Sequence, residues 1–292
     1  MKILDYKNSK LVLGTAQFES NYGITSKSKL SSGEMKKILR SSFSRKIEML
    51  DTAADYDKVE ESLGNLQIKN MKIISKASIV KNKIIIKKND LEKTINRTLK
   101  NLQVKSLYAF LLRRPCLLIN NKGILKTLLK LKEKGFYSKI GFSLYSPDEL
   151  KKIYKIFKPD IVQIPINIID NRFERSGWLD ILKKDKVEIH ARSIFLQGLL
   201  LEDPQNLPLY FQKYKSFFLK LEKWFKQNKI SNLEACLSKV FLDERVSNIV
   251  IGINNKAHLD EIVKTNIKNF TTPKWFLKNE EKLINPKLWS LV

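Results

Sequence analysis

Short apolar runs alternate with segments of helical spacing along the whole chain. Eight of these runs have the length and composition of buried strands. They span residues 11–13, 47–50, 72–75, 107–112, 139–143, 161–164, 187–192 and 248–251. Because the segments between them read as helices, the pattern predicts parallel strands joined by crossover helices. The fold is then either a (β/α)8 TIM barrel or a doubly wound sheet.

Three of the predicted helices carry start signals. A serine cap opens the helix that begins at Ser32, and Asp90 is the expected cap of a second helix. Ser146 precedes Pro147 and two acidic residues, which suits the positive end of a third helix. Residues 202–221 predict a loop and then a helix over one end of the barrel.

The turn after the first predicted strand separates the two possible folds. A doubly wound nucleotide-binding sheet needs a Gly-x-Gly-x-x-Gly turn at this place. The sequence there is Leu-Gly-Thr-Ala-Gln, which has one glycine. The TIM barrel is therefore favoured. No linker rich in Pro, Gly or Ser divides the chain, so we predict a single domain over 1–292, with 271–292 as a C-terminal tail over the barrel mouth or its outer wall.

The chain is strongly basic, with a formal net charge of +25. Such a charge attracts polyanions, nucleic acid among them. The lysines are spread through every predicted helix and do not alternate with aromatic residues in one patch, so a nucleic-acid or other polyanion site is the less favoured interpretation. The positive field also suits a phosphate-bearing dinucleotide.

Several other classes of protein are disfavoured. The apolar runs are too short to cross a membrane, and the first residues lack the apolar segment of a signal peptide. Cys116 and Cys236 predict free thiols in a reducing cytoplasm. The cysteines and histidines lack ligand spacing, so no metal site is expected. These features predict a cytoplasmic protein without metal or membrane partners.

Three ionisable residues follow the C-terminal ends of predicted strands. Asp51 and Tyr56 come after the second strand, and Lys76 comes after the third. Active sites of parallel barrels lie at the C-terminal strand ends, so we expect these groups to form one polar cluster. Such a cluster lowers the pKa of a tyrosine toward the range in which it transfers protons near neutral pH.

The chain resembles the aldo-keto reductases from residue 11 to about residue 266. The resemblance rests on six motifs in the order of the family, at 13–17, 51–56, 140–143, 160–167, 192–200 and 249–252. The Arg-Ser-x-Phe-Leu-Gln-Gly variant is similar to bacterial members found with polysaccharide and sugar-modification pathways. The resemblance implies an NADP(H)-dependent oxidoreductase that interconverts a carbonyl and an alcohol on a small polar substrate, such as a sugar or nucleotide sugar.

The resemblance also implies a catalytic set. Tyr56 would carry the proton, Lys76 would lower the pKa of Tyr56, and Asp51 would hold Lys76. The family's fourth member is a histidine after strand four, where this chain has Arg113. An arginine there donates hydrogen bonds to a developing oxyanion or binds an acidic group of the substrate.

Cofactor-binding positions are carried over from the same motifs. Ser143 and Gln163 match the residues that hold the nicotinamide amide, and Arg192 replaces a tyrosine that stacks on the ring. Asn167 is expected near the same mouth. Lys256, at the start of the last helix, is the candidate for the 2′-phosphate that would select NADP over NAD. The full set is Gly14, Thr15, Ser143, Gln163, Arg192, Ser193, Phe195, Gln197, Gly198, Gly252, Asn254 and Lys256.

Arg113 leaves several functions open. The enzyme is a reductase with altered substrate or rate, a redox enzyme for an acidic sugar derivative, or a catalytically impaired barrel that binds a nucleotide or a protein partner. The two histidines lie on other segments, so neither His190 nor His258 is expected to replace the missing one.

Overall fold

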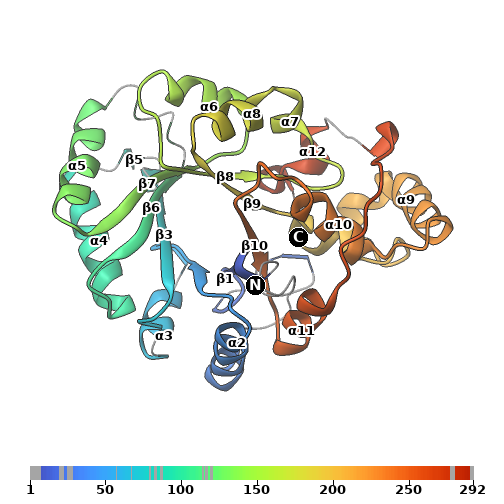
Figure 1. Ribbon diagram of the computed structural model, residues 1–292, viewed down its shortest axis with the longest axis horizontal. Coiled ribbons are helices and arrows are strands. Elements are labelled where there is room, and N and C mark those ends of the chain that lie inside the picture. Colours follow the sequence, from blue (N-terminus) through green and yellow to red (C-terminus); the bar gives the residue numbers. More distant parts are fainter. Residues whose placement is uncertain are drawn as a thin grey trace.

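Eight parallel strands close into a barrel, with helices around its outside (Figure 1). This arrangement confirms the (β/α)8 TIM barrel. The computed structural model describes residues 8–19, 23–24, 29–56, 58–66, 68–78, 80–81, 84–85, 88–113, 115, 118, 121–276 and 280–289. The barrel strands are β1 (Leu11–Gly14), β2 (Met49–Asp51), β3 (Lys72–Ser78), β6 (Leu107–Arg113), β7 (Tyr137–Ser143), β8 (Ile161–Pro165), β9 (Glu188–Arg192) and β10 (Asn248–Gly252).

Helices follow the strands in sequence and cover the barrel. They are α2 (Ser32–Ser44), α3 (Val59–Gly64), α4 (Lys88–Leu102), α5 (Lys122–Glu133), α6 (Pro147–Tyr154), α7 (Arg172–Arg175), α8 (Trp178–Lys184), α9 (Lys215–Gln227), α10 (Asn232–Phe241), α11 (Lys256–Lys264) and α12 (Glu281–Ile284). Short 3-10 segments also occur, among them η2 (Leu196–Leu201), η3 (Leu209–Tyr214), η4 (Lys274–Phe276) and η5 (Pro286–Leu288). A small hairpin of β4 (Val80–Lys81) and β5 (Ile84–Ile85), which the sequence pattern did not predict, lies between β3 and α4.

The helix starts agree in part with the sequence pattern. Ser146 caps α6 as expected, because its hydroxyl accepts the Glu149 N–H at 3.2 Å. The cap of α2 is Ser31 instead of Ser32, since the hydroxyl of Ser31 accepts the amide three residues ahead. The expected cap Asp90 lies inside the first turn of α4. The capping chemistry was therefore predicted better than its exact residue.

Two apolar layers hold the barrel together. The larger one lies between the strands and the surrounding helices. The smaller one fills the barrel interior with Val12, Met49, Ile74, Ala109, Leu111 and Ile161. Alternate residues of each strand serve the two layers, so strands buried on both faces read as continuous apolar runs in the sequence.

Strand register brings polar residues to one rim of the barrel. Gly14 of β1 pairs with Asp51 of β2 on one side and with Gly252 of β10 on the other. Ser143 of β7 pairs with Arg113 of β6 and with Gln163 of β8. All of these positions lie at or near the C-terminal strand ends, which is the rim that carries active sites in this fold.

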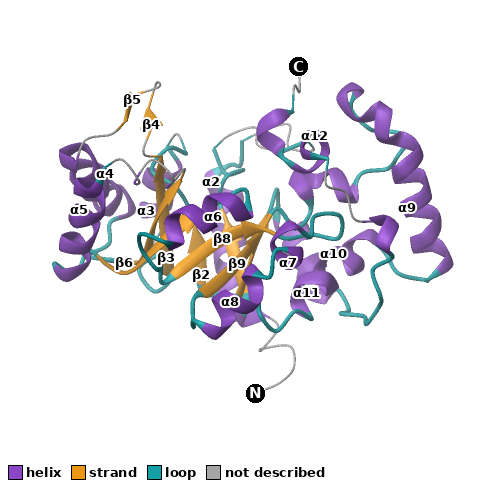
Figure 2. Ribbon diagram, turned by 90° about the horizontal axis from the view of Figure 1, so that it is seen from above, coloured by secondary structure: helices purple, strands orange, loops and turns teal. Residues whose placement is uncertain are grey.

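The segment after β9 builds an arm beside the barrel. The predicted helix is η3 followed by α9, and Figure 2 shows α9 at one end of the molecule, outside α10. Phe276 and Trp289, which follow residue 270, pack on this arm. Ring centres lie 4.9 Å apart for Trp224 and Phe276 and 4.8 Å apart for Phe211 and Trp289. Aromatic contacts thus attach the C-terminal segment to α9 and η3.

Within the described residues, no helix has both the length and the apolar character needed to cross a bilayer. The same residues contain no group of three or more His, Cys, Asp or Glu side chains placed to hold a metal ion. Cys236 is a buried free thiol, and burial raises its pKa. Cys116 lies outside the described residues.

Candidate active site

Asp51, Lys76 and Gln163 form a buried polar chain at the rim. Asp51 is 4% exposed and Lys76 is 2% exposed. Lys76 Nζ donates to Asp51 Oδ1, and Gln163 Nε2 donates to Asp51 Oδ2 at 2.7 Å. Ser143 Oγ donates to Gln163 Oε1 at 3.4 Å. The structure therefore joins two predicted catalytic residues to two predicted cofactor residues through the carboxylate of Asp51.

Tyr56 lies beside this chain because of the turn that follows β2. The N–H of Ala54 donates to the carbonyl of Lys76 at 2.8 Å, which continues the contact between β2 and β3 beyond the end of β2. The N–H of Tyr56 then donates to the carbonyl of Ala53 at 3.0 Å and closes the turn. As a result, Lys76 Nζ lies 5.6 Å from the centre of the Tyr56 ring. The predicted cluster of phenol, ammonium and carboxylate is present.

Burial changes the charge balance of this cluster. Removal from water lowers the pKa of Lys76 to about 8, although the carboxylate of Asp51 acts in the opposite direction. Arg113 lowers the pKa of Lys76 further by charge repulsion. The lysine is therefore poised near neutral pH, where a small change in its surroundings alters its charge.

Arg113 stands at the end of β6, where the sequence places it, and forms an ion pair. Its Nη1 donates to both carboxylate oxygens of Asp55, at 2.9 and 2.8 Å. Its guanidinium carbon lies 4.9 Å from the centre of the Tyr56 ring. Burial opposes the charge of Arg113, but Tyr56, Asp55 and Tyr145 outweigh it and raise the pKa of Arg113. A charged arginine, held by a carboxylate, thus lies beside the phenol.

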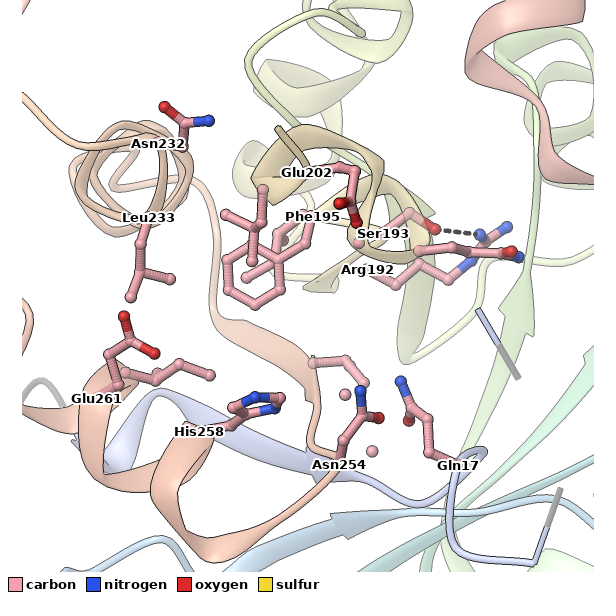
Figure 3. Close-up of a pocket in the computed structure, with 18 of the residues that line it drawn as sticks. Gln17, Arg192, Ser193, Phe195, Glu202, Asn232, Leu233, Asn254, His258 and Glu261 are labelled. Carbon is pink, nitrogen blue, oxygen red and sulfur yellow. Dashed lines mark hydrogen bonds between the residues drawn. The ribbon is translucent and has the colours of Figure 1, made fainter. Parts of the chain in front are cut away.

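A cavity of about 880 Å³ opens next to these residues. Figure 3 shows Arg192 and Ser193 on one side of it and Leu233 and Glu261 on the other. The predicted residues in its wall are Asp51, Tyr56, Gly14, Thr15, Gln163, Arg192, Ser193, Phe195, Gln197, Gly198, Gly252 and Asn254. Four other predicted residues do not line it, namely Lys76, Arg113, Ser143 and Lys256.

The loop after β9 borders the cavity with an unusual backbone. Ser193, Leu196 and Gln197 have positive φ angles of 55°, 47° and 56°, and Gly198 has a φ of 96°. Two N–H groups of this loop are bonded within it, because Leu196 donates to the carbonyl of Ser193 at 2.9 Å and Gly198 donates to that of Phe195 at 3.0 Å. Asn167 supports the loop from below, because its Nδ2 donates to the carbonyl of Ser193 at 3.1 Å. Asn167 is fully buried and is not part of the cavity wall, contrary to the expected place near the mouth.

Gly252 lets another side chain reach the cavity. A Cβ at this position would lie 2.3 Å from Nε2 of Gln17, so any larger residue would displace that side chain. Gln17 and Asn254 lie side by side at the lower edge of the cavity (Figure 3). The buried Oδ1 of Asn254 has no hydrogen-bond partner in the described part of the chain.

The start of α11 differs from the prediction. Its amides were expected to face a phosphate, but the N–H of Lys256 donates to Oε1 of Glu34 at 2.8 Å, and the N–H of His258 donates to the Asn255 side chain at 2.9 Å. Nζ of Lys256 pairs with Asp260 at 2.6 Å. A carboxylate from α2 therefore takes the place of the expected anion, and the helix start serves the packing of α2 against α11.

Arg192, which is expected beside the nicotinamide ring, has several contacts within the protein. It forms no salt bridge with any carboxylate of the described residues. Its Nη1 donates to Ser193 Oγ at 3.1 Å and its Nη2 to the carbonyl of Leu144 at 2.9 Å. Its guanidinium carbon lies 4.1 Å from the centre of the Tyr145 ring, so an aromatic face is already provided by the protein.

Several residues of the site were not identified from the sequence. Asp55 lies inside the motif at 51–56, Gln17 lies inside the motif at 13–17, and Tyr145 follows the motif at 140–143, so these motifs were the available signal. The others come from separate elements and carried no clear signal: Glu202, Asn232, His258 and Glu261. Side chains that meet only in the folded chain have no fixed spacing in the sequence.

The cavity fits a nicotinamide dinucleotide. Its volume lies in the upper part of the range of roughly 300–1,000 Å³ for ligand and cofactor sites. It extends from Tyr56 and Gln163, past the loop of positive φ angles, to α10 and α11. The free oxygen of Asn254 is an acceptor for a ribose hydroxyl, and Gln163 presents an amide near Tyr56. The residues present therefore suit the ring, the pyrophosphate and a ribose in that order.

Comparison with known proteins gives a consistent result for the fold. A solved structure from Pseudomonas aeruginosa, assigned as an aldo-keto reductase, is 20% identical to this chain. It superposes with a TM-score of 0.65 over 87% of this chain and 88% of the other chain. The holo form of an aldo-keto reductase from Bacillus halodurans is 16% identical, with a TM-score of 0.72 and coverage of 89% and 88%. A thermostable aldo-keto reductase in complex with epalrestat is 22% identical, with a TM-score of 0.68 and coverage of 94% and 92%.

These identities by themselves show the fold alone. Among curated protein sequences, none matches the chain significantly. The family model described as the Aldo/keto reductase family matches residues 10–275, which is most of the chain. The chain belongs to the aldo-keto reductase family, and its activity class is that of oxidoreductases acting on carbonyls and alcohols.

Proposed function

We propose that this protein is an NADP(H)-dependent reductase of a small polar carbonyl compound, with the chain 1–292 acting as one domain. The observation that supports this proposal most strongly is the arrangement of Tyr56, Lys76 and Asp51, which lie together beside a cavity of dinucleotide size. A sugar or nucleotide sugar is the substrate class that the sequence resemblance favours.

The proposed chemistry divides between cofactor and protein. When bound, a reduced nicotinamide dinucleotide supplies a hydride to the carbonyl carbon of the substrate. Tyr56 gives its phenolic proton to the carbonyl oxygen, which becomes the alcohol. The ammonium of Lys76 stabilises the phenolate that remains, and Asp51 holds Lys76 in place.

Arg113 is proposed to act on the substrate oxygen in place of the family's histidine. Its pair with Asp55 uses Nη1 and does not involve Nη2. A guanidinium held in this way stays protonated at any ordinary pH, so it donates a hydrogen bond to the substrate oxygen. Asp55 also offsets part of the positive charge beside Tyr56, so that the phenol keeps its proton more readily than it would beside a bare arginine.

The preference for NADP(H) is proposed from Lys229 in the cavity wall. Lys229 follows α9 and lines the cavity near Asn232, whereas Lys226, at the end of α9, already pairs with Glu222 at 2.6 Å. Lys256 is less suited to a 2′-phosphate than the sequence indicated, because Asp260 already binds its ammonium. NAD(H) is the alternative cofactor, since Glu222 and Glu261 line the same region and repel a phosphate.

The first experiment mixes the protein with NADPH or NADH and a panel of aldehydes and open-chain sugars, and follows the loss of reduced cofactor. We expect turnover with at least one carbonyl class and a tighter Kd for NADPH. A second function remains in view because Arg113 replaces the histidine. Cofactor fluorescence that changes on binding, with no turnover of any carbonyl, would identify a nucleotide-binding barrel without reductase activity.

Substitution of Arg113 separates these two functions. For a working reductase, Arg113→His changes the rate and the substrate range of an activity already present in the natural protein. Activity that appears only in the Arg113→His variant would show that the natural site is not a reductase site. Asp55→Asn is the matched control, because it keeps Arg113 but removes the carboxylate that holds it.

A further inference from the structure

Arg192 is a cation in the cavity wall with no carboxylate partner among the described residues. Other arginines at this rim are paired with carboxylates, Arg113 with Asp55 and Arg172 with Asp170, each at 2.8 Å. Arg192 instead has neutral partners, Ser193 Oγ and the carbonyl of Leu144. Its Nε is buried and has no hydrogen-bond partner in the same part of the chain. A half-buried guanidinium with neutral partners favours binding of an anion.

A second cation lies beside Arg192. Nζ of Lys287 is 3.6 Å from the centre of the Tyr145 ring, the same ring that Arg192 contacts at 4.1 Å. Lys287 therefore adds a second positive charge beside the Tyr145 ring.

The position of Lys287 is set by contacts of the C-terminal segment. Tyr210 donates to the carbonyls of Lys282 and Leu288, at 2.9 and 3.2 Å. Arg172 also forms an ion pair with Glu281 at the start of α12. Because the arm and the barrel both hold this segment, Lys287 comes to the rim from a part of the chain distant from the motifs.

The neighbouring strands indicate where the anion would lie. Arg113 at the end of β6 pairs in register with Ser143 of β7, and Arg192 donates to the carbonyl of the next residue, Leu144, at 2.9 Å, so both arginines lie at the C-terminal end of β7. Arg113 stands against the ring of Tyr56. The Arg192 cluster is therefore on the side of the site where the substrate would meet Tyr56. The α11 end of the cavity is on its opposite side (Figure 3).

We propose that Arg192, supported by Tyr145 and Lys287, binds a carboxylate or phosphate of the substrate, so that the enzyme acts on acidic carbonyl compounds. This inference rests on the proposed function and adds the substrate class. It assigns the anion to Arg192 instead of Arg113, because Asp55 already neutralises Arg113.

The test compares 4-formylbenzoate with its methyl ester, which carries the same aldehyde without the charge. The natural protein is expected to show a kcat/KM about 10- to 100-fold higher for the acid, the effect of one or two charged hydrogen bonds. Arg192→Met removes that preference, so that kcat/KM becomes similar for the acid and the ester. Lys287→Met reduces the preference by a smaller factor. Arg175→Met, on the exposed surface of α7, lowers the net charge equally and keeps the preference.

Two results would overturn the proposal. One is equal use of acid and ester by the natural protein, or a preference that survives in Arg192→Met. The other is a loss in Arg192→Met that appears in the Kd for NADPH and leaves the acid-to-ester ratio unchanged, because the anion would then belong to the cofactor.

Calorimetric binding of 4-formylbenzoate keeps this test separate from that of the proposed function. If no carbonyl is turned over but the acid binds to the natural protein at least about tenfold more tightly than to Arg192→Met, the anion site stands and the reductase function fails. Equal binding to both proteins would overturn the anion site whatever the turnover.

Discussion

Two polar clusters in this barrel contain the same three groups and differ in what surrounds them. The upper cluster of Asp51, Lys76 and Tyr56 lies at the C-terminal strand ends. The lower cluster of Glu188, Lys139 and Tyr108 lies near the N-terminal ends of β9, β7 and β6. Each has a carboxylate, an ammonium and a phenol, so residue type alone does not distinguish them.

The lower cluster is closed by its own hydrogen bonds. Tyr108 donates to Glu188 at 2.8 Å and accepts from Lys139 at 2.7 Å, while His190 Nε2 lies 3.2 Å from Glu188. Burial alone would raise the pKa of Glu188, but His190, Lys139 and Tyr108 outweigh it and lower the pKa to about 2. Burial, followed by the bond to Glu188, keeps the pKa of Tyr108 above its usual range.

In the upper cluster the partner groups do not offset the effect of burial. Burial lowers the pKa of Lys76, and Tyr56 lines a cavity wide enough for a cofactor. The lesson is that a charged triad stabilises the barrel where its groups satisfy one another, and becomes a candidate for catalysis where the phenol faces a ligand cavity. The position at the C-terminal strand ends decides between the two.

The largest expected effect separates the two phenols. Tyr56→Phe should lower kcat for carbonyl reduction by about 10²- to 10⁴-fold, because the proton donor is lost. The Kd for NADPH should stay close to that of the natural protein. Tyr108→Phe is the matched control and should leave kcat within about twofold. Steady-state kinetics and cofactor fluorescence measure both, and equal losses in the two variants would contradict the assignment of roles.

The next effect separates the two lysines by stability. Lys76→Met leaves the carboxylate of Asp51 buried without its cation, which should lower the free energy of unfolding by about 3–5 kcal/mol. Lys139→Met should lower it by about 1 kcal/mol, because the Lys139–Glu188 pair is partly exposed. Urea denaturation measures both. Recovery of most of the stability in the double variant Asp51→Asn with Lys76→Met would show that the buried charge is the cause; no recovery would contradict it.

The smallest effect is the response of the two clusters to pH. Lys76 loses its proton as pH rises through about 8, so kcat for reduction should fall by about tenfold above that pH, because the phenolate loses its neighbouring cation. Lys76→Arg should move this decline to higher pH, since a guanidinium stays charged. A pH profile of kcat that stays flat from 7 to about 9.5 would contradict the position of Lys76 in the mechanism.

The lower cluster responds in acid. The folded-state pKa of Glu188 is below its ordinary value, so its contribution is fully present above about pH 4.5 and is lost as pH falls toward 2. Unfolding free energies measured across this range should fall less steeply for Glu188→Gln than for the natural protein. Identical slopes would show that other carboxylates control the acid response.

The sequence was sufficient for the barrel and for the approximate places of its strands, although Lys76, expected after the third strand, lies inside β3. Apolar runs at regular intervals predict buried parallel strands, and Asp51, Lys76 and Arg113 were found at or near the strand ends because register in a barrel is constrained by burial. The sequence was not sufficient to predict which polar groups bind one another. The amide groups at the start of α11 were expected to meet a phosphate, and Glu34 from α2 meets one of them instead.

Partner choice depended on the tertiary structure, because ion pairs form between whatever side chains the packing brings within a few ångströms. Asp55 pairs with Arg113, whereas the partners of Arg192 among the described residues are neutral groups and the ring of Tyr145. Lys287 reaches that ring from the far end of the chain. Local patterns thus determined which elements form, and the folded arrangement alone decided which charges meet one another.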